Sequence, residues 1–201
     1  MPTGWLPIKT RVVALATLGL TALSLGPALA GTAEEAAMQA FLDARIRTFA
    51  TDPVIIAALT AQNARTAGLA QTEIEAMDQT WRAEVGAAET PTITPVLGNA
   101  ASDFLRGQVE AAAGAITEVF VMDVVGLNVA SSGVTSDYWQ GDEAKFTETF
   151  GKGPDAAHFG DIERDESTGT YQAQISLTLV DPATGTPIGA MTVGVNAEAL
   201  F

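Results

Sequence analysis

The chain contains no cysteine, and its 201 residues include a single histidine, His158. Without cysteine there is no disulfide framework, no thiolate zinc site and no cysteine nucleophile. One histidine cannot build a multi-histidine metal site, although it could serve in a Ser-His-Asp triad. The sequence also lacks a G-x-S-x-G motif, a phosphate-binding loop and a dinucleotide glycine fingerprint. We therefore expect no enzymatic activity, no metal site and no cofactor.

Basic residues are scarce as well. Ten Lys and Arg stand against 24 Asp and Glu, which gives a formal net charge of −14 and a pI of about 4.2. Nucleic-acid binding requires a basic face, and attraction to anionic lipid requires clustered Lys and Arg, so neither partner is expected. Hydrophobic residues make up 47% and charged residues 17% of the chain, a composition typical of globular proteins.

One long apolar run occurs, and it lies near the N-terminus. Lys9 and Arg11 precede an apolar stretch at residues 12–25, and Ala28-Leu29-Ala30 has the form of an A-x-A cleavage site. These three parts predict a secretory signal peptide over residues 1–30, cut after Ala30, and hence a periplasmic or secreted protein. The run is shorter than the roughly 20 residues of a membrane span, but an uncleaved anchor remains the alternative.

Residues 31–114 show apolar positions at three- and four-residue spacing, which is typical of amphipathic helices. Asp52-Pro53 predicts a helix start, with aspartate as N-cap and proline in the first turn. Thr72 with Glu75 predicts a capping box, and the proline-containing segment 87–94 predicts a loop. Four helices are expected, within residues 32–49, 53–67, 72–85 and 99–112.

Residues 115–201 change to strand patterns. Alternation is clearest in residues 170–180, where Ala173, Ile175 and Leu177 face one way. Gly126 and Gly185 predict tight turns, and residues 142–150 predict a short helix. The expected strands cover residues 117–123, 127–131, 159–165, 170–180 and 187–195. The fold class is therefore α+β: a PAS-like antiparallel sheet of about five strands with the N-terminal helices packed against it.

In this order of elements, residues 116–201 resemble a Cache domain, the PAS-like, PDC-type extracellular sensor module of bacterial chemoreceptors and sensor kinases. The segments that carry the resemblance are residues 119–123, 126–130, 136–142, 171–176 and 181–189. Family members usually lie between two transmembrane helices and signal to a cytoplasmic output. This chain ends at Phe201 without a second span, so we expect a single-domain exported form that does not signal across the membrane by itself.

The resemblance implies a small-molecule ligand, such as a carboxylate or an amino acid, enclosed between the sheet and the loop at residues 133–141. Tyr138 and Trp139 lie in this loop and are candidates for the pocket wall, with core packing as the alternative. Asp137 and Lys145 are nearby charges that could bind the polar ends of a ligand. Tyr171 opens the long strand, whose inward residues reach the ligand in the family.

Further residues have two interpretations each. Arg106 ends the last helix and could pair with a carboxylate, or it could lie on a solvated face. Asp142 is expected to cap the following helix, and Asp123 to stabilise the turn after its strand. His158 could be a pH-sensitive contact or an ordinary loop residue. The acidic residues of 161–166 lack the glycine of a calcium loop and are better explained as a solvated strand face.

The expected function is ligand binding of the sensor type, followed by a signal to a membrane-bound partner. The alternative is a protein-interaction or structural module with a non-functional pocket, which docks on a membrane receptor or self-associates. A homodimer through the N-terminal helices is compatible with both. A hydrolase with an unrecognised site has no motif in its favour.

Overall fold

The computed structural model describes Met1, residues 33–164 and residues 170–201. The expected signal peptide lies outside the described residues apart from Met1, and so do Asp165 and Glu166 of the acidic run. Among the helices in the described part of the chain, none has both the length and the apolar character that a bilayer crossing requires.

The first helical segment is continuous and contains a wider turn. Its three parts are α1 (Ala33–Phe41), the π-helical turn η1 (Leu42–Ile46) and α2 (Arg47–Ala50). Met38, Leu42 and Ile46 are all buried and follow one another at intervals of four residues. This spacing is typical of the apolar stripe that a helix turns towards the core.

Four further helices follow: α3 (Pro53–Thr66), α4 (Gln71–Glu84), α5 (Ile93–Leu97) and α6 (Ala100–Ala111). The predicted start of α3 is confirmed, because the Asp52 carboxylate accepts a hydrogen bond of 2.9 Å from the Val54 N–H. The start of α6 is also as expected, since the Asn99 side chain accepts from the Ser102 N–H.

Two predictions in this region are wrong. The capping box at Thr72 does not form, because α4 begins at Gln71 and Glu73 accepts the Ala70 N–H at 2.8 Å. The expected loop 87–94 ends in α5, which begins at Ile93. Helix α5 can begin there because the Glu84 carboxylate accepts hydrogen bonds from the backbone N–H groups of Thr92 and Ile93. These are donors that the start of a helix leaves unsatisfied.

The sheet is antiparallel, and its path runs β2-β1-β6-β5-β3, with the short β4 also paired to β5. The strands are β1 (Ile116–Met122), β2 (Asn128–Ser131), β3 (Ala157–Phe159), β4 (Glu163–Arg164), β5 (Tyr171–Val180) and β6 (Pro187–Asn196). The α+β prediction is confirmed. One strand expected at 159–165 is instead two short ones, β3 and β4, which both pair with β5.

The helix expected at residues 142–150 is likewise two pieces, α7 (Ala144–Thr147) and η2 (Phe150–Lys152). Asp142 is not its cap, because Glu143 occupies the N-cap position and makes no capping hydrogen bond through its side chain. The Thr149 hydroxyl donates 2.7 Å to the Lys145 carbonyl and thereby ends α7. The turn predictions hold: Gly126 and Gly185 have φ values of +88° and +69°.

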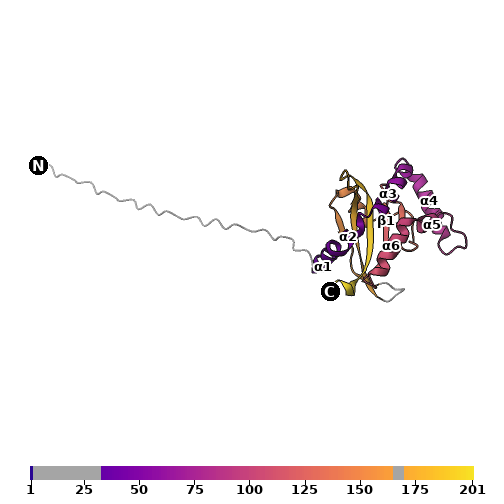
Figure 1. The fold of residues 1–201 in the computed structure, drawn as a ribbon. Coiled ribbons are helices and arrows are strands. Elements are labelled where there is room, and N and C mark those ends of the chain that lie inside the picture. Colours follow the sequence, from indigo (N-terminus) through magenta and orange to yellow (C-terminus); the bar gives the residue numbers. More distant parts are fainter. Residues whose placement is uncertain (2–32, 165–169) are drawn as a thin grey trace. The chain divides into compact units, whose positions relative to one another are not determined.

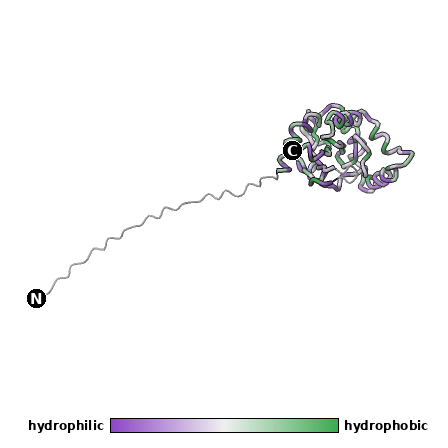
Figure 2. Tube along the Cα trace, turned by 90° about the horizontal axis from the view of Figure 1, so that it is seen from below, coloured by the Kyte–Doolittle hydropathy of each residue, from purple (hydrophilic) through white to green (hydrophobic). Residues whose placement is uncertain are grey.

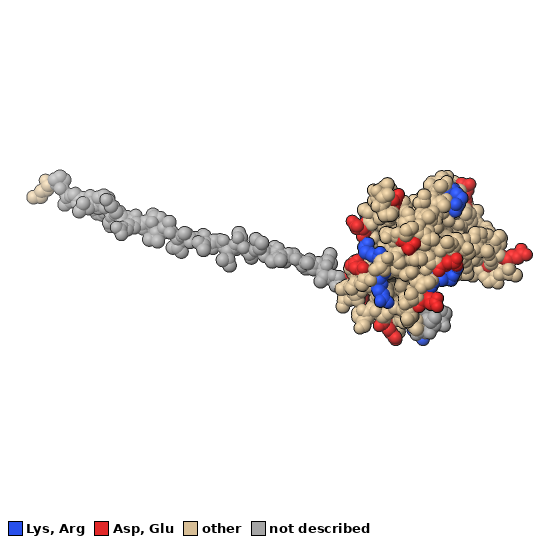
Figure 3. All heavy atoms as spheres, in the orientation of Figure 1, with Lys and Arg blue, Asp and Glu red and all other residues tan. Residues whose placement is uncertain are grey.

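Helices α3 and α6 contact one face of the sheet, which we call the helical face (Figure 1). Its strand residues are Val119, Val121, Ile175, Leu177, Leu179, Met191, Val193 and Val195. The opposite face, called the loop face below, contacts α7 and η2. Apolar and polar stretches alternate along the folded part of the chain (Figure 2), and acidic side chains are scattered over the visible surface rather than gathered in one patch (Figure 3).

Candidate functional site

The loop face is built from two rows of residues that are paired across the strands. Directly paired residues point to the same side of a sheet, so each row can be read from the register. The first row consists of Ser131, Phe120, Thr192, Ser176 and His158. The second row consists of Asn128, Met122, Ala190 and Thr178. Most of these side chains are polar, in contrast to the aliphatic helical face.

The hydroxyl groups on this face are buried. Ser176 and Thr192 are fully buried, and their hydroxyls form a hydrogen bond of 3.0 Å with each other. Thr178 is 5% exposed, and its hydroxyl has no hydrogen-bond partner among the described residues. A buried polar atom without a partner costs about 1–3 kcal/mol. Such an atom is uncommon in a folded protein and is a reason to look for a ligand there.

Helix α7 and the turn η2 cover these rows. Phe146 of α7 stacks on Phe150 of η2 with ring centroids 5.3 Å apart. Phe146 also packs in one buried cluster with Phe120, Met122 and Ala190. The cover is therefore apolar, while the strand residues beneath it carry hydroxyls.

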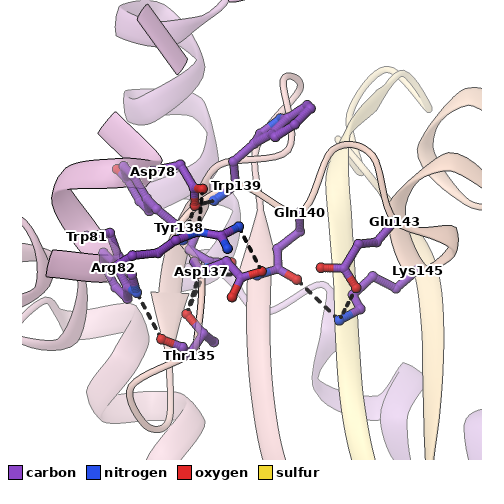
Figure 4. A network of polar contacts seen from close by, with 11 residues as sticks. Asp78, Trp81, Arg82, Thr135, Asp137, Tyr138, Trp139, Gln140, Glu143 and Lys145 are labelled. Carbon is purple, nitrogen blue, oxygen red and sulfur yellow. Dashed lines mark hydrogen bonds and ion pairs between the residues drawn. The ribbon is translucent and has the colours of Figure 1, made fainter. Parts of the chain in front are cut away.

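Lys145 brings a positive charge to the edge of the loop face. Its Nζ lies 3.0 Å from Glu143 Oε2 and 3.2 Å from Gln140 Oε1 (Figure 4). It also lies 5.4 Å from the centre of the Phe120 ring. A cation over an aromatic ring is stabilised by the ring electrons. Phe120 is paired with Thr192, so Lys145 lies over the ring of a residue in the first row of the loop face.

The segment that leads to α7 is held by α4. The Asp78 carboxylate accepts the N–H groups of Tyr138 at 2.9 Å and Trp139 at 3.0 Å. Arg82 lies between Asp78 and Asp137 and pairs with both (Figure 4). Asp137 thus has an internal ion-pair partner. Sequence reasoning missed Asp78, although a carboxylate four residues before Arg82 on a helix was a usable signal for their pairing.

Tyr138 packs inside the helical region. Its ring stacks on Trp81 of α4, with centroids 5.0 Å apart and planes 4° from parallel. The Trp81 indole N–H donates to the Thr135 carbonyl, which fixes the same segment a second time. Burial, followed by the nearby Asp123 carboxylate, raises the pKa of Tyr138 to about 12, so its hydroxyl stays protonated at neutral pH.

Trp139 closes the β1–β2 turn. Its indole N–H donates 2.8 Å to the Val125 carbonyl, so this donor is already used within the fold. A side chain at Gly126 or Gly141 would overlap with neighbouring atoms, including the indole at Gly141. Residues 138–140 also run alongside β2: Trp139 forms a bridge with Leu127, and backbone hydrogen bonds flank it.

The expectation that Asp123 stabilises its turn is confirmed. One carboxylate oxygen accepts the N–H groups of Val125 and Leu127, at 2.9 and 3.0 Å. The other accepts from the Gln62 amide and the Thr66 hydroxyl of α3, at 3.0 and 2.7 Å. This fully buried carboxylate therefore joins the β1–β2 turn to α3.

The remaining candidates lie elsewhere. Tyr171 is 55% exposed at the start of β5, where it pairs with Arg164 of β4. Arg106 of α6 pairs with Asp103 and donates to the Leu97 carbonyl at 2.9 Å. In the described part of the chain, neither residue forms a hydrogen bond, ion pair or ring contact with Lys145. His158 lies in the first row of the loop face, beside Ser176.

Across residues 33–164 and 170–201 no cluster of three or more His, Asp or Glu side chains could hold a metal ion. The loop face thus combines buried hydroxyls with an apolar cover, and the Lys145 ammonium lies over the Phe120 ring of the same face. Their chemistry suits the two ends of a small polar molecule, because the hydroxyls can donate or accept and the ammonium attracts a carboxylate.

No family model matches the chain, and no curated protein matches it. Solved structures do. The sensor domain of the Vibrio cholerae histidine kinase DctB is 16% identical with a TM-score of 0.45, and the match covers 83% of this chain and 53% of that one. The ligand-binding domain of the Campylobacter jejuni chemoreceptor Tlp3, in complex with 4-methylisoleucine, is 12% identical with a TM-score of 0.38, covering 88% and 65%.

The ligand-binding domain of the Pseudomonas aeruginosa amino acid chemoreceptor PctC, in complex with GABA, is 14% identical with a TM-score of 0.39, covering 73% and 60%. The chain thus spans between about half and two thirds of the length of these matched chains. The structural neighbours are sensor domains of histidine kinases and chemoreceptors. The likeness is one of fold.

Proposed function

We propose that this chain is an exported ligand-binding domain of the sensor type, which binds a small polar metabolite on the loop face beneath α7. The observation that carries the proposal is the set of buried hydroxyls at Ser176, Thr192 and Thr178, of which Thr178 has no partner among the described residues. A purely structural sheet gains nothing from burying the unpaired Thr178 hydroxyl, whereas a polar ligand would satisfy it.

The charge beside this row indicates the ligand class. Lys145 is 84% buried as a side chain, yet its partners are the exposed end of Glu143 and the neutral amide of Gln140. A ligand carboxylate could replace either partner and form a charge-assisted hydrogen bond. We therefore favour a small carboxylate or an amino acid, with its carboxylate at Lys145 and its polar end at the hydroxyls.

The signal would arise from movement of the cover. Asp78 and Trp81 hold residues 135–139 firmly, so ligand binding would act on α7 and η2 rather than on the whole segment. A ligand that prefers one position of this cover shifts the population towards it, and the changed surface is then available to a membrane-bound partner.

The second candidate function is an interaction module with a non-functional pocket, which docks on a membrane receptor or self-associates. It is favoured by the stacked rings of Phe146 and Phe150, which already occupy the space over the loop face, and by the existing partners of Lys145. In that case the N-terminal helices would offer the surface for a second copy.

A thermal-shift screen with amino acids and small carboxylates distinguishes the two functions. A true ligand at a hundred times its Kd stabilises the folded chain by about 2.7 kcal/mol and raises Tm. Lys145→Met is expected to abolish this rise. Lys152→Met is the matched control, since Lys152 is an exposed lysine paired only with Glu148 among the described residues. If no compound raises Tm, or if Lys145→Met responds like the unaltered chain, the ligand-binding proposal is wrong.

Thr178→Val provides an independent check because valine keeps the shape of threonine and removes only the hydroxyl. Loss of a hydroxyl that has no protein partner leaves the free chain at least as stable. The same change should weaken ligand binding several-fold, since the ligand then meets a methyl group. Unchanged affinity, measured by titration calorimetry, would place the ligand elsewhere.

A further inference from the structure

A groove of about 420 Å³ lies on the helical side of the molecule, between α3, α5 and β2. Its volume falls within the range of small-molecule sites. The apolar part of its wall consists of Ala58, Ala61, Pro91, Pro95, Val96 and Val129. Tyr138 lines the same groove, while Lys145 and the hydroxyl rows of the loop face do not. The groove is therefore separate from the site proposed above.

Arg65 is the only formally charged residue that lines this groove. One of its terminal nitrogens donates 2.8 Å to the Ala61 carbonyl, and no ion pair joins it to any acid in the described part of the chain. A guanidinium has five N–H donors in a flat fork, so most of them remain available.

The Tyr138 hydroxyl is the second available group. It forms no hydrogen bond with any described residue, although Tyr138 is only 6% exposed. The charge of Arg65 acts on this hydroxyl and partly offsets the effect of burial on its pKa, so the two groups are within electrostatic reach of each other. The hydroxyl stays protonated at neutral pH and can donate to an acceptor near Arg65.

The buried carboxylate of Asp123 limits the charge that the groove can accept. Its influence reaches Tyr138, whose pKa it raises. Four donors bind this carboxylate and reduce its field without removing it. Gln62 donates to Asp123 and also lines the groove, so this carboxylate lies next to the groove wall. One negative charge at Arg65 is compensated by the guanidinium, but a second would be opposed by Asp123. The groove therefore suits a monoanion better than a phosphate.

We propose that this groove is a second ligand site, specific for a small monocarboxylate with an apolar body. Arg65 binds the carboxylate, the Tyr138 hydroxyl donates a hydrogen bond to it, and the apolar body rests against Pro91, Pro95 and Val129. Because Tyr138 belongs to the segment that leads to α7, a ligand here contacts the support of the loop face without entering that face.

Fluorine NMR on the full chain tests this site, because the sequence contains only two tyrosines. With 3-fluorotyrosine incorporated, Tyr138 and the exposed Tyr171 give two signals, assigned with Tyr171→Phe. Benzoate is the probe, and neutral benzamide is its control. Benzoate is expected to shift the Tyr138 signal saturably and to leave Tyr171 unchanged, whereas benzamide should have little effect.

Variants locate the response. Arg65→Gln should weaken benzoate binding about tenfold, the value of one charge-assisted hydrogen bond. Arg106→Gln, on another exposed arginine, should leave it unchanged, and so should Lys145→Met, which removes the cation of the loop face. The proposal is overturned if benzoate leaves Tyr138 unshifted, if benzamide or Arg65→Gln gives the same curve, or if Lys145→Met abolishes the response.

Discussion

The helical face and the loop face belong to the same strands but have opposite chemistry. On β5, Ile175 and Leu177 point into the helical core, while the intervening Ser176 points to the loop face. All three are buried. The helical face is aliphatic and packs against complete helices, whereas the loop face carries hydroxyls beneath two short helical turns.

This difference suggests that the helical face provides stability, whereas the loop face is suited to the proposed binding. Aliphatic side chains packed against α3 and α6 remove apolar area from water and provide most of the folding free energy. Buried hydroxyls contribute little net stability and specify position instead. A short cover such as α7 can also move at lower cost than a helix of three or four turns. The loop face is thus the part of the sheet that can change.

The largest expected contrast lies between neighbours on β5. Leu177→Ala opens a cavity in the helical core and should cost about 2–5 kcal/mol of the free energy of unfolding. Ser176→Ala on the loop face removes one hydroxyl pair and should cost about 1 kcal/mol. Urea denaturation of both variants measures the difference. Equal losses would show that the two faces contribute alike to stability.

The stability of the chain at alkaline pH tests whether Tyr138, in the segment before α7, is buried in the helical region. The pKa of Tyr138 is raised from 10.0 to about 12 in the folded chain, by burial and then by Asp123. The unfolded chain therefore loses this proton first, so the stabilisation is complete below pH 10 and is lost as pH rises towards 12. Two pKa units correspond to about 3 kcal/mol.

Tyr138→Phe should remove this part of the alkaline destabilisation, and Tyr171→Phe should retain it, in urea unfolding followed across that pH range. The same slope in Tyr138→Phe and the unaltered chain would mean that the Tyr138 hydroxyl is not buried in the helical core.

Asp78→Ala tests the link between α4 and the loop segment. It leaves the N–H groups of Tyr138 and Trp139 without their acceptor and should cost about 2 kcal/mol. Amide exchange at these two residues should accelerate, while exchange in β5 and β6 changes little. Asp43→Ala is the control, because it removes only exposed contacts with Arg47 and Gln39 on the helix surface and should change stability little. Unchanged exchange at Tyr138 would contradict the role of Asp78.

The finest test compares two threonines of the loop face. Thr192→Val leaves the Ser176 hydroxyl unpaired and should cost about 1 kcal/mol. Thr178→Val removes a hydroxyl without a partner in the described residues and should be neutral or slightly stabilising. Opposite signs of the change in Tm, measured by differential scanning calorimetry, would support a loop face on which one hydroxyl has no hydrogen-bond partner. A comparable loss in both variants would show that Thr178 has a partner.

Local signals in the sequence were sufficient for much of the fold. Asp52-Pro53 and Asn99 mark helix starts through contacts two or three residues away, and Gly126 and Gly185 mark turns through their own φ angles. Such features need no tertiary information. The start of α4 was predicted wrongly, although its signals are also local. Thr72 and Glu73 are both plausible capping residues, and their local sequence does not decide between them.

The candidate site was less accessible from sequence. Alternation along β5 placed Ser176 and Thr178 opposite the aliphatic residues, but it could not tell whether that side faced solvent or a cover. Burial there depends on α7, about thirty residues earlier in the chain. The partner of the Tyr138 N–H is more distant still, since Asp78 lies 60 residues away. The six predicted site residues therefore remain a proposal, in which Lys145 belongs to the loop face and Tyr138 to the groove.

The pairing of residues 138–140 with β2 has a consequence for how any ligand could enter. The Asn128 N–H donates 3.0 Å to the Tyr138 carbonyl, and the Gln140 N–H donates 2.8 Å to the Gly126 carbonyl. β2 is the end strand of the sheet, and this segment covers its first residue. Unpaired edges invite pairing with other chains and aggregation. The ligand route proposed above, beneath α7 and η2, would leave this cover in place.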